Sequence, residues 1–147
     1  MVGFGPHLVL DGHGCRKKKL QDLNLIYRIL DEFPAGIGMT KIMPPYVFRY
    51  GGGRPEDWGI SGFVLVAESH VSIHTFPEKC FISVRIFSGG SFDSELATDL
   101  LKKTFEMERV EQRMLDRGTE FPKTINGAAE IVRSERLRIT APIARTA

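Results

Sequence analysis

The sequence predicts an α+β protein, a two-layer α/β sandwich whose mainly antiparallel sheet carries helices on one face. Short apolar runs bounded by turn residues follow one another along the chain, as consecutive antiparallel strands do. Two other stretches, 20–30 and 94–107, repeat their apolar residues at helical spacing. Because each such helix has one apolar side to bury, we expect the helices to form a second layer on the sheet.

A strand, a helix and a second strand are expected in the first third of the chain. Residues 7–11 form an apolar run that the glycine-rich stretch 12–14 closes, which is typical of a strand followed by a turn. The helical pattern that begins at Leu20 should end at Pro34, because proline disrupts a helix interior. Residues 39–43 suit a short second strand.

The middle of the chain is expected to hold a long loop, two central strands and a helix. Residues 43–58 should form the loop, because they contain adjacent prolines, three consecutive glycines and the only tryptophan. Apolar runs at 63–67 and 81–87 predict central strands. Asp93 or Ser94 should cap the second helix.

The C-terminal part has a weaker pattern. Residues 110–115 suit a last strand, and beyond Pro122 a basic helix over 128–137 and a frayed end both fit the composition. We therefore expect one domain over residues 1–122 and a C-terminal tail over residues 123–147 that is partly helical or disordered.

Composition limits the class of protein. With 147 residues and 42% hydrophobic content, the chain suits one compact domain. Its 20 basic and 18 acidic side chains give a net charge of +2, which argues against nucleic acid or a membrane surface as partner. Since there is no membrane-length apolar run and no secretion signal, we expect a cytoplasmic protein, with Cys15 and Cys80 as free thiols.

Two histidines draw attention to the segment between the two central strands. His70 and His74 would share one face of a helix, as metal ligands do, but the β-branched residues between them favour an extended chain. We therefore expect no metal. Judged by residue types alone, the segment is best explained as a buried strand whose polar side chains are satisfied by their neighbours.

The same segment resembles a known motif. Ala67-Glu-Ser-His-Val-Ser-Ile-His-Thr-Phe-Pro-Glu78 is similar to the self-processing segment of the prokaryotic-type S-adenosylmethionine decarboxylase proenzymes. The resemblance extends over roughly residues 3–117. Its supporting matches are Gly5-Pro-His-Leu, Gly12-His-Gly-Cys15 and Gly59-Ile-Ser-Gly-Phe-Val-Leu.

The resemblance implies a self-cleaving, pyruvoyl-dependent decarboxylase. Ser69 would attack the carbonyl of Glu68, and elimination from the resulting ester would leave fragments 1–68 and 69–147, the second beginning with a pyruvoyl group. His74 matches the histidine that assists processing, as the base of the elimination. The pyruvoyl group would form a Schiff base with the substrate amine, so that neither a metal nor pyridoxal phosphate is needed.

The resemblance also implies a substrate pocket and an assembly. Glu78 matches the acidic residue that binds the ribose of the nucleoside, and Phe76 and Phe48 lie at aromatic positions of the pocket. The less favoured alternatives are that Glu78 is an exposed turn carboxylate and Phe76 a core aromatic residue, whereas Phe48 could equally pack its loop. Members of the family borrow residues across a twofold interface, so a homodimer is expected.

One position departs from the family. Gly89 stands where the family has the cysteine that donates a proton to the product, and Arg85 stands in place of an aspartate. Glycine has no proton to donate, so Cys80, Ser88 or a bound water would have to replace it.

Three hypotheses follow. The first is an S-adenosylmethionine decarboxylase of polyamine and spermidine biosynthesis, which the motif favours and Gly89 weakens. The second is a decarboxylase of the same lineage acting on ornithine or arginine. The third is a non-catalytic homologue that binds a partner protein.

Overall fold

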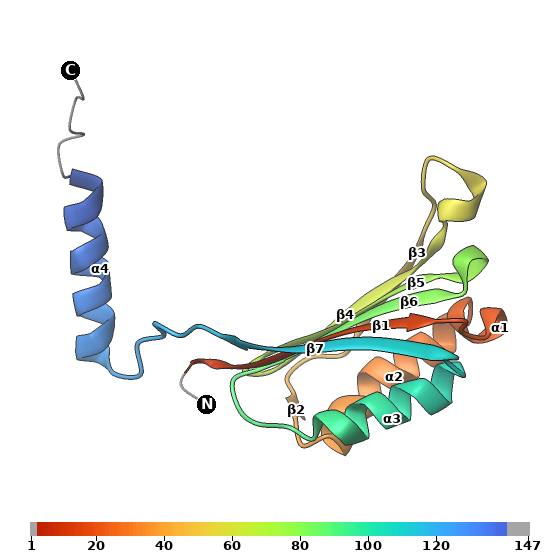
Figure 1. Ribbon diagram of the computed structural model, residues 1–147, viewed down its shortest axis with the longest axis horizontal. Coiled ribbons are helices and arrows are strands. Elements are labelled where there is room, and N and C mark those ends of the chain that lie inside the picture. Colours follow the sequence, from red (N-terminus) through yellow and green to blue (C-terminus); the bar gives the residue numbers. More distant parts are fainter. Residues whose placement is uncertain (1–2, 141–147) are drawn as a thin grey trace.

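A single antiparallel sheet of seven strands organises the molecule (Figure 1). The computed structural model describes residues 3–140. The strand order is β2-β4-β5-β6-β1-β7, and β3 pairs with β4 beside β2. The strands are β1 Gly5–His13, β2 Thr40–Lys41, β3 Tyr46–Tyr50, β4 Gly59–Ala67, β5 Ser69–Phe76, β6 Phe81–Ser88 and β7 Arg109–Arg117.

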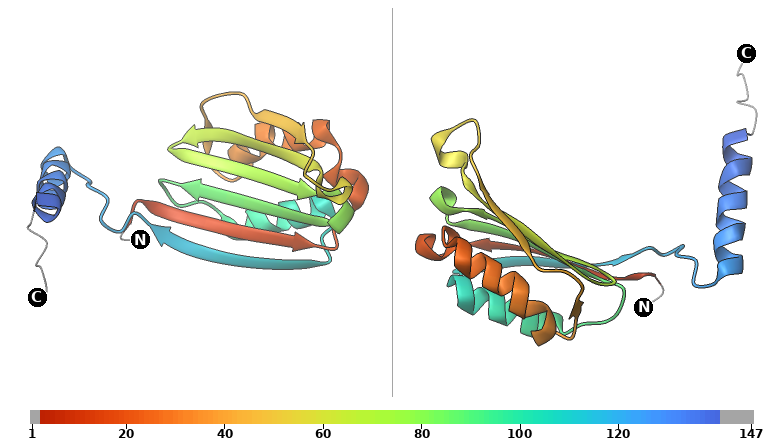
Figure 2. Two further views of the ribbon diagram at one scale, coloured as in Figure 1. Left: turned by 90° about the horizontal axis from the view of Figure 1, so that it is seen from above. Right: turned by 180° about the vertical axis from the view of Figure 1, so that it is seen from behind.

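Two helices, α2 (Leu23–Gly36) and α3 (Ser94–Phe105), form the second layer on one face of the sheet (Figures 1 and 2). Each is capped by an aspartate: Asp22 accepts a hydrogen bond from the amide of Leu25, and Asp93 accepts one from Leu96. Their buried residues, such as Leu30 and Phe105, meet the inward side chains of the strands. The predicted two-layer α+β sandwich and the Asp93 cap are confirmed.

Within residues 3–140, the opposite face of the sheet carries no helix (Figure 2). Alternate residues of β5 and β6 are buried under the helices, and the residues between them point to the open face. The open face is aromatic and basic. By strand register it carries Phe48, Phe63, His70, His74, Phe76, Arg85 and Phe87.

The prediction that Pro34 ends the first long helix is wrong by two residues, because α2 continues to Gly36. Proline at this place removes one hydrogen-bond donor near a helix end. Its ring is buried, and its carbonyl still accepts hydrogen bonds from the amides of Ile37 and Met39. The expected second strand is also shorter than predicted, since β2 has only two residues.

The prediction of a loop over residues 43–58 is wrong for residues 46–50, which form strand β3 along β4. Tyr46, Phe48 and Tyr50 alternate with Val47 and Arg49, so three aromatic side chains share the open face. Tyr46 contacts Phe63 across the strands, with 5.8 Å between ring centroids. Strand β1 also runs past the expected turn at Gly12, because Gly12 and His13 still pair with β7.

Three short helices lie in the connections between the larger elements. They are α1 (Lys17–Leu20) and the 3-10 turns η1 (Pro55–Asp57) and η2 (Pro77–Lys79). η2 joins β5 to β6 at the end of the sheet near α1 (Figure 1).

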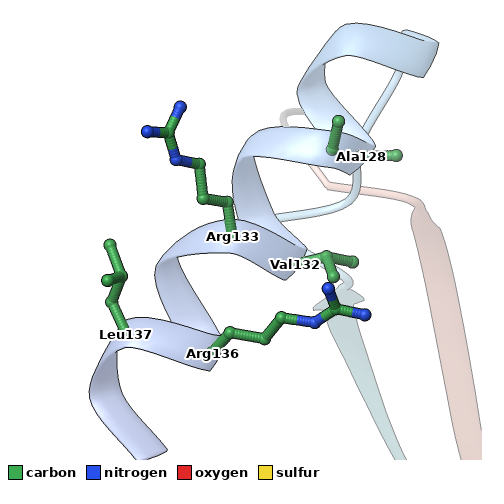
Figure 3. Close-up of a pocket in the computed structure, with 6 residues that line it drawn as sticks. Ala128, Val132, Arg133, Arg136 and Leu137 are labelled. Atoms are coloured by element: carbon green, nitrogen blue, oxygen red, sulfur yellow. The ribbon is translucent and has the colours of Figure 1, made fainter. Parts of the chain in front are cut away.

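The C-terminal segment contains a helix, α4 (Ile125–Thr140), that stands apart from the sheet (Figure 1). A shallow hollow on α4 is lined by Ala128, Ala129, Val132, Arg133, Arg136 and Leu137 (Figure 3). All six residues belong to this one helix, so the hollow is part of a helix surface and includes none of the predicted site residues. Among residues 3–140, no helix is long and apolar enough to span a membrane.

Candidate active site

Glu68 and Ser69 lie where β4 turns into β5, at one end of the sheet. Ser69 is the first residue of β5, and its φ of 143° lies in a region that residues with a side chain rarely adopt. The peptide between Glu68 and Ser69 is therefore held by a strained residue. Glu68 is exposed and lines the pocket described next, and Ser69 is half-buried.

A backbone donor faces the carbonyl of Glu68. The amide of Gly89 donates a hydrogen bond to this oxygen over 2.9 Å. If a nucleophile adds to the Glu68 carbonyl, the same oxygen becomes negatively charged, and a donor already in place stabilises that charge. A pocket of about 580 Å³ opens beside this pair, and its lining residues are Gly3, Phe4, Glu68, Gly89, Gly90, Ser91, Phe121 and Lys123.

The space that a side chain at position 89 would occupy is partly filled by Phe4. A side-chain carbon added at Gly89 would lie 3.0 Å from the tip of the Phe4 ring and 3.3 Å from the Glu68 carbonyl oxygen. Gly89 does not have a left-handed conformation, in contrast to Gly118. A residue with a side chain therefore suits the backbone at position 89, provided that Phe4 shifts by a few tenths of an ångström.

His70 lies next to Ser69 on the open face. Its Nδ1 is 3.4 Å from the Ser69 hydroxyl oxygen, and its ring meets the edge of Phe87 at a centroid distance of 6.0 Å. Arg117 of β7 stacks on the same Phe87 ring, 4.5 Å from its centroid, and donates to His7. Burial, and then the charges of Arg117 and Arg85, lower the pKa of His70 from its ordinary value.

His74 lies farther along β5 and pairs with a serine of β4. Its Nδ1 is 2.9 Å from the Ser61 hydroxyl oxygen, and the two residues are direct cross-strand neighbours. Burial, and then the charge of Arg85, lower the pKa of His74. When Nδ1 carries the proton and donates it to Ser61, Nε2 is left as a proton acceptor. The arrangement therefore suits a histidine that acts as a base at neutral pH.

Glu78 lies on η2, beyond the last residue of β5. Lys17 donates to its carboxylate over 2.7 Å and the Trp58 indole donates over 3.2 Å. These two hydrogen bonds, that of Lys17 first, lower the pKa of Glu78, so the exposed carboxylate is ionised at neutral pH. It is therefore able to accept hydrogen bonds from hydroxyl groups of a ligand.

Phe76 and Phe48 lie on the same face as His74. Phe76 contacts Phe81 across the strands at a centroid distance of 5.6 Å. Phe48 is the register neighbour of Ser61, which in turn pairs with His74, so Phe48 lies in the row of His74. Phe48 is 43% exposed, so its ring is free to contact a ligand.

These residues form two groups at different ends of the sheet. The cleavage end comprises Glu68, Ser69, His70, Gly89 and Arg117, and the far end comprises Ser61, His74, Phe76, Glu78 and Phe48. Within one chain, His74 lies about 16 Å from Ser69 along β5, and Phe76 about 23 Å, at the usual rise of a strand. The residues that the motif joins in sequence therefore do not meet within a single protomer.

Of the two side chains considered as proton donors, Cys80 lies far from Ser69 in the same chain and Ser88 lies beside it. Cys80 follows η2 at the far end, where its carbonyl accepts a hydrogen bond from the amide of Cys15. Both cysteines are free, and burial, with the neighbouring Cys80, raises the pKa of Cys15 to about 11. Ser88 is cross-strand neighbour to Ser69, but its side chain is buried and accepts from the amide of Gly90.

Three participants were not predicted from the sequence. These are Ser61, His70 and the backbone amide of Gly89. Ser61 and His70 carry polar groups within the motifs, but only strand register brings Ser61 to His74. A backbone amide leaves no signal in the residue type, so the role of Gly89 was detectable only in three dimensions.

Known proteins share this arrangement of sequence and fold. The family model of S-adenosylmethionine decarboxylase matches residues 6–118. A proenzyme of that name from Pyrococcus furiosus is 33% identical over 121 residues, which cover 82% of this chain and 83% of the relative. One from Clostridium botulinum is 32% identical over 115 residues, or 78% of this chain and 94% of the relative.

A solved structure supports the same relationship. The crystal structure of the adenosylmethionine decarboxylase from Aquifex aeolicus superposes with a TM-score of 0.63 at 26% sequence identity, and the match covers 80% of this chain and 93% of that chain. The family match runs from β1 to β7 and includes both the cleavage end and the far end. Sequence and structure together show that the chain belongs to the S-adenosylmethionine decarboxylase family.

Proposed function

We propose that the chain is the proenzyme of an S-adenosylmethionine decarboxylase, which cleaves itself between Glu68 and Ser69. The family match supports S-adenosylmethionine as substrate over ornithine or arginine, and it favours an enzyme over a non-catalytic homologue. The observation that carries the cleavage proposal is the hydrogen bond from the Gly89 amide to the Glu68 carbonyl, because it marks that carbonyl as an electrophile.

The residues at the cleavage end fit the formation of a pyruvoyl group from Ser69. The strained, half-buried Ser69 follows Glu68 directly, and Glu68 and Gly89 line a pocket of about 580 Å³. A pyruvoyl group supplies a carbonyl that withdraws electrons from an amino-acid substrate when carbon dioxide leaves. It is made from the chain itself, so the proposal requires no metal and no pyridoxal phosphate.

The far end suits a nucleoside. The ionised carboxylate of Glu78 is placed to accept hydrogen bonds from ribose hydroxyls, and Phe48 and Phe76 offer rings against which a flat base can pack. In this proposal Lys17 and Trp58 orient the carboxylate, since both already donate to it.

The functional unit is proposed to be a homodimer with shared sites. A twofold axis that sets two open faces against each other in opposite directions brings the far end of one protomer to the cleavage end of its partner. His74 then acts on the Ser69 of the partner chain, which removes the separation of about 16 Å along β5, and Glu78 binds the substrate at the same shared site. Exposed rings such as Tyr46 and Phe63 on the open face support its burial in an interface.

The proton donor of the decarboxylation is proposed to be a bound water or the Cys80 thiol of the partner protomer. In the shared site, the far end of the partner is closer to Ser69 than the far end of the same chain. Ser88 is a weaker candidate, because its hydroxyl is buried toward the helices.

We infer further that residues 1–122 form the decarboxylase domain and residues 123–147 a C-terminal extension. The proposed enzyme is cytoplasmic and binds a small substrate and a second copy of itself, and it needs neither nucleic acid nor a membrane.

Intact-mass measurement of the purified protein tests the cleavage proposal. We expect fragments that match residues 1–68 and 69–147, the second blocked to Edman sequencing by its pyruvoyl group. Ser69→Ala should leave one intact chain, because it lacks the hydroxyl that attacks Glu68. A wild-type chain that stays intact after long incubation as a folded dimer would contradict the proposal. Release of labelled carbon dioxide from S-adenosylmethionine, and none from ornithine or arginine, tests the substrate.

A further inference from the structure

His70 is the titratable side chain that touches Ser69 in the same chain. Its Nδ1 lies 3.4 Å from the Ser69 hydroxyl oxygen, a distance at which a small movement of either side chain gives a short hydrogen bond. Both residues are half-buried at the start of β5, so the pair is partly shielded from water. His74, in contrast, lies about 16 Å away along the strand.

The neighbours of His70 position its ring. Phe87, its cross-strand partner on β6, meets the ring edge-on at 6.0 Å, and Leu65 of β4 lies opposite on the other side. Arg117 is fixed above Phe87 by a cation–π contact and by its hydrogen bond to His7. The imidazole is therefore held between two strands by contacts that do not use its Nδ1.

The charges that face His70 are mainly positive. They come from Arg117 on β7 and Arg85 on β6, with His7 on β1 at the same end of the open face and the Glu68 carboxylate on the pocket side. Burial and the two arginines lower the pKa of His70, which favours the neutral imidazole at neutral pH. A neutral ring whose unprotonated Nδ1 faces the Ser69 hydroxyl is able to accept its proton.

We propose that His70 moves the proton in the first step of self-cleavage and that His74 of the partner acts only in the second. This division rests on the proposed self-cleavage at Glu68. His70 Nδ1 removes the proton of the Ser69 hydroxyl while the hydroxyl oxygen bonds to the Glu68 carbonyl carbon. The bond between that carbon and the Ser69 nitrogen then breaks, and His70 returns the proton to the nitrogen. The amide becomes an ester and a free amine, and His70 ends as it began.

The second step needs a different base in a different place. Elimination removes the hydrogen on the Ser69 Cα and breaks the Ser69 Cβ–Oγ bond, so that this oxygen leaves as part of the new carboxylate of Glu68. The dehydroalanine left at residue 69 tautomerises to an imine, which water hydrolyses to the pyruvoyl group and ammonia. The His74 imidazole, oriented by Ser61, is the base proposed for it. The two histidines therefore predict two variants that stop at different covalent states.

Hydroxylamine distinguishes these states, because at neutral pH it cleaves an ester rapidly and an ordinary amide hardly at all. Precursors that carry His70→Gln or His74→Gln are purified, treated with hydroxylamine and weighed intact. The His74→Gln precursor should break into a Glu68 hydroxamate fragment and a fragment 69–147 that begins with unmodified serine. The His70→Gln precursor should stay intact with and without hydroxylamine, with cleavage slowed by about 100-fold or more.

Controls separate a lost proton carrier from a lost fold. His13→Gln changes a histidine on the same face at the far end of β1 and should process as the wild type does. If His70→Gln does not fold, the rate at which His74→Gln becomes hydroxylamine-sensitive is measured against pH instead. That rate should fall as pH decreases, following one protonation, because the protonated ring cannot accept the Ser69 proton.

The outcomes also separate this inference from the proposed function. Hydroxylamine-sensitive ester in His70→Gln at the rate of His74→Gln would overturn the role of His70 and leave self-cleavage intact, as would ester formation in His74→Gln that does not change with pH. A wild-type chain without cleavage and a His74→Gln chain without ester would instead contradict the proposed function itself.

Discussion

The cleavage end and the far end of the open face carry different kinds of chemistry. At the cleavage end, a strained serine, a backbone amide and a half-buried histidine surround one carbonyl. At the far end, a hydrogen-bonded histidine, aromatic rings and an ionised carboxylate are spread over an exposed surface. The first group suits a reaction of the chain on itself, and the second suits a ligand. The comparison teaches that one continuous motif holds two groups of residues about 16 Å apart, which the proposed dimer would join into one site.

The largest expected effect comes from mixing two inactive chains. Ser69→Ala lacks the nucleophile, and His74→Gln lacks the proposed base, so neither homodimer should complete cleavage. In a mixed dimer, the intact His74 of the Ser69→Ala chain should serve Ser69 of the His74→Gln chain. Intact mass of a coexpressed, differently tagged pair should show the His74→Gln chain cleaved and the other whole.

A matched control uses a chain that carries both substitutions. Mixed with His74→Gln, it supplies no intact base and should leave every chain whole. Mixed dimers of Ser69→Ala and His74→Gln in which all chains stay whole would contradict shared sites. A wild-type protein that light scattering shows to be a monomer and that is fully active would contradict them as well.

An intermediate effect is expected from Glu78→Gln. The substitution keeps the shape of the side chain and removes the negative charge that is proposed to accept ribose hydroxyl groups. Losing one charge-assisted hydrogen bond should raise KM for S-adenosylmethionine about tenfold, while cleavage stays at the wild-type rate. Steady-state kinetics and intact mass measure the two quantities. A slowed cleavage with unchanged KM would place Glu78 in processing instead. Glu111→Gln, on β7, is the control at an exposed carboxylate outside both groups.

The smallest effect is expected from Gly89→Cys. A thiol at this position would restore the proton donor of the family, but its first carbon would lie 3.0 Å from Phe4. We expect turnover to rise about threefold, well below the 100-fold or more of a well-placed general acid. Gly89→Ala adds the carbon without the thiol, and Phe4→Leu with Gly89→Cys relieves the crowding. Equal loss of turnover in the cysteine and alanine variants would argue against a missing acid.

Much of the fold was predictable from periodicity. The central strands and both long helices follow apolar patterns that local spacing makes visible, and Asp93 lies where a cap is expected. Strand β3 was missed because glycine and proline at 51–55 dominated the interpretation, although Tyr46, Phe48 and Tyr50 already alternate with period two. The end of α2 was predicted too early at Pro34, because a proline in the last turn of a helix removes only one backbone hydrogen-bond donor.

The candidate site was predictable only in part. The family motif indicated Glu68, Ser69, His74 and Glu78 as candidate residues, but it did not state which of them lie close together within one chain. Strand β5 places Glu68 and Ser69 at one end of the sheet and His74 and Glu78 at the other. This distance depends on the extended conformation of the segment, which the motif does not specify. Ser61 and Arg117 reach the motif from other strands, so their contribution depends on register, which the sequence does not state.

The donor that faces the Glu68 carbonyl belongs to the main chain of residue 89. Nineteen of the twenty amino acids carry that N–H, and only proline lacks it. A change of side chain at residue 89, including the absence of a thiol, therefore leaves in place the amide that donates to the Glu68 carbonyl. The proposed self-cleavage uses the backbone amide of residue 89, whereas proton donation during turnover would use its side chain. A chain with glycine at this position therefore keeps the group for self-cleavage and lacks the side chain for proton donation.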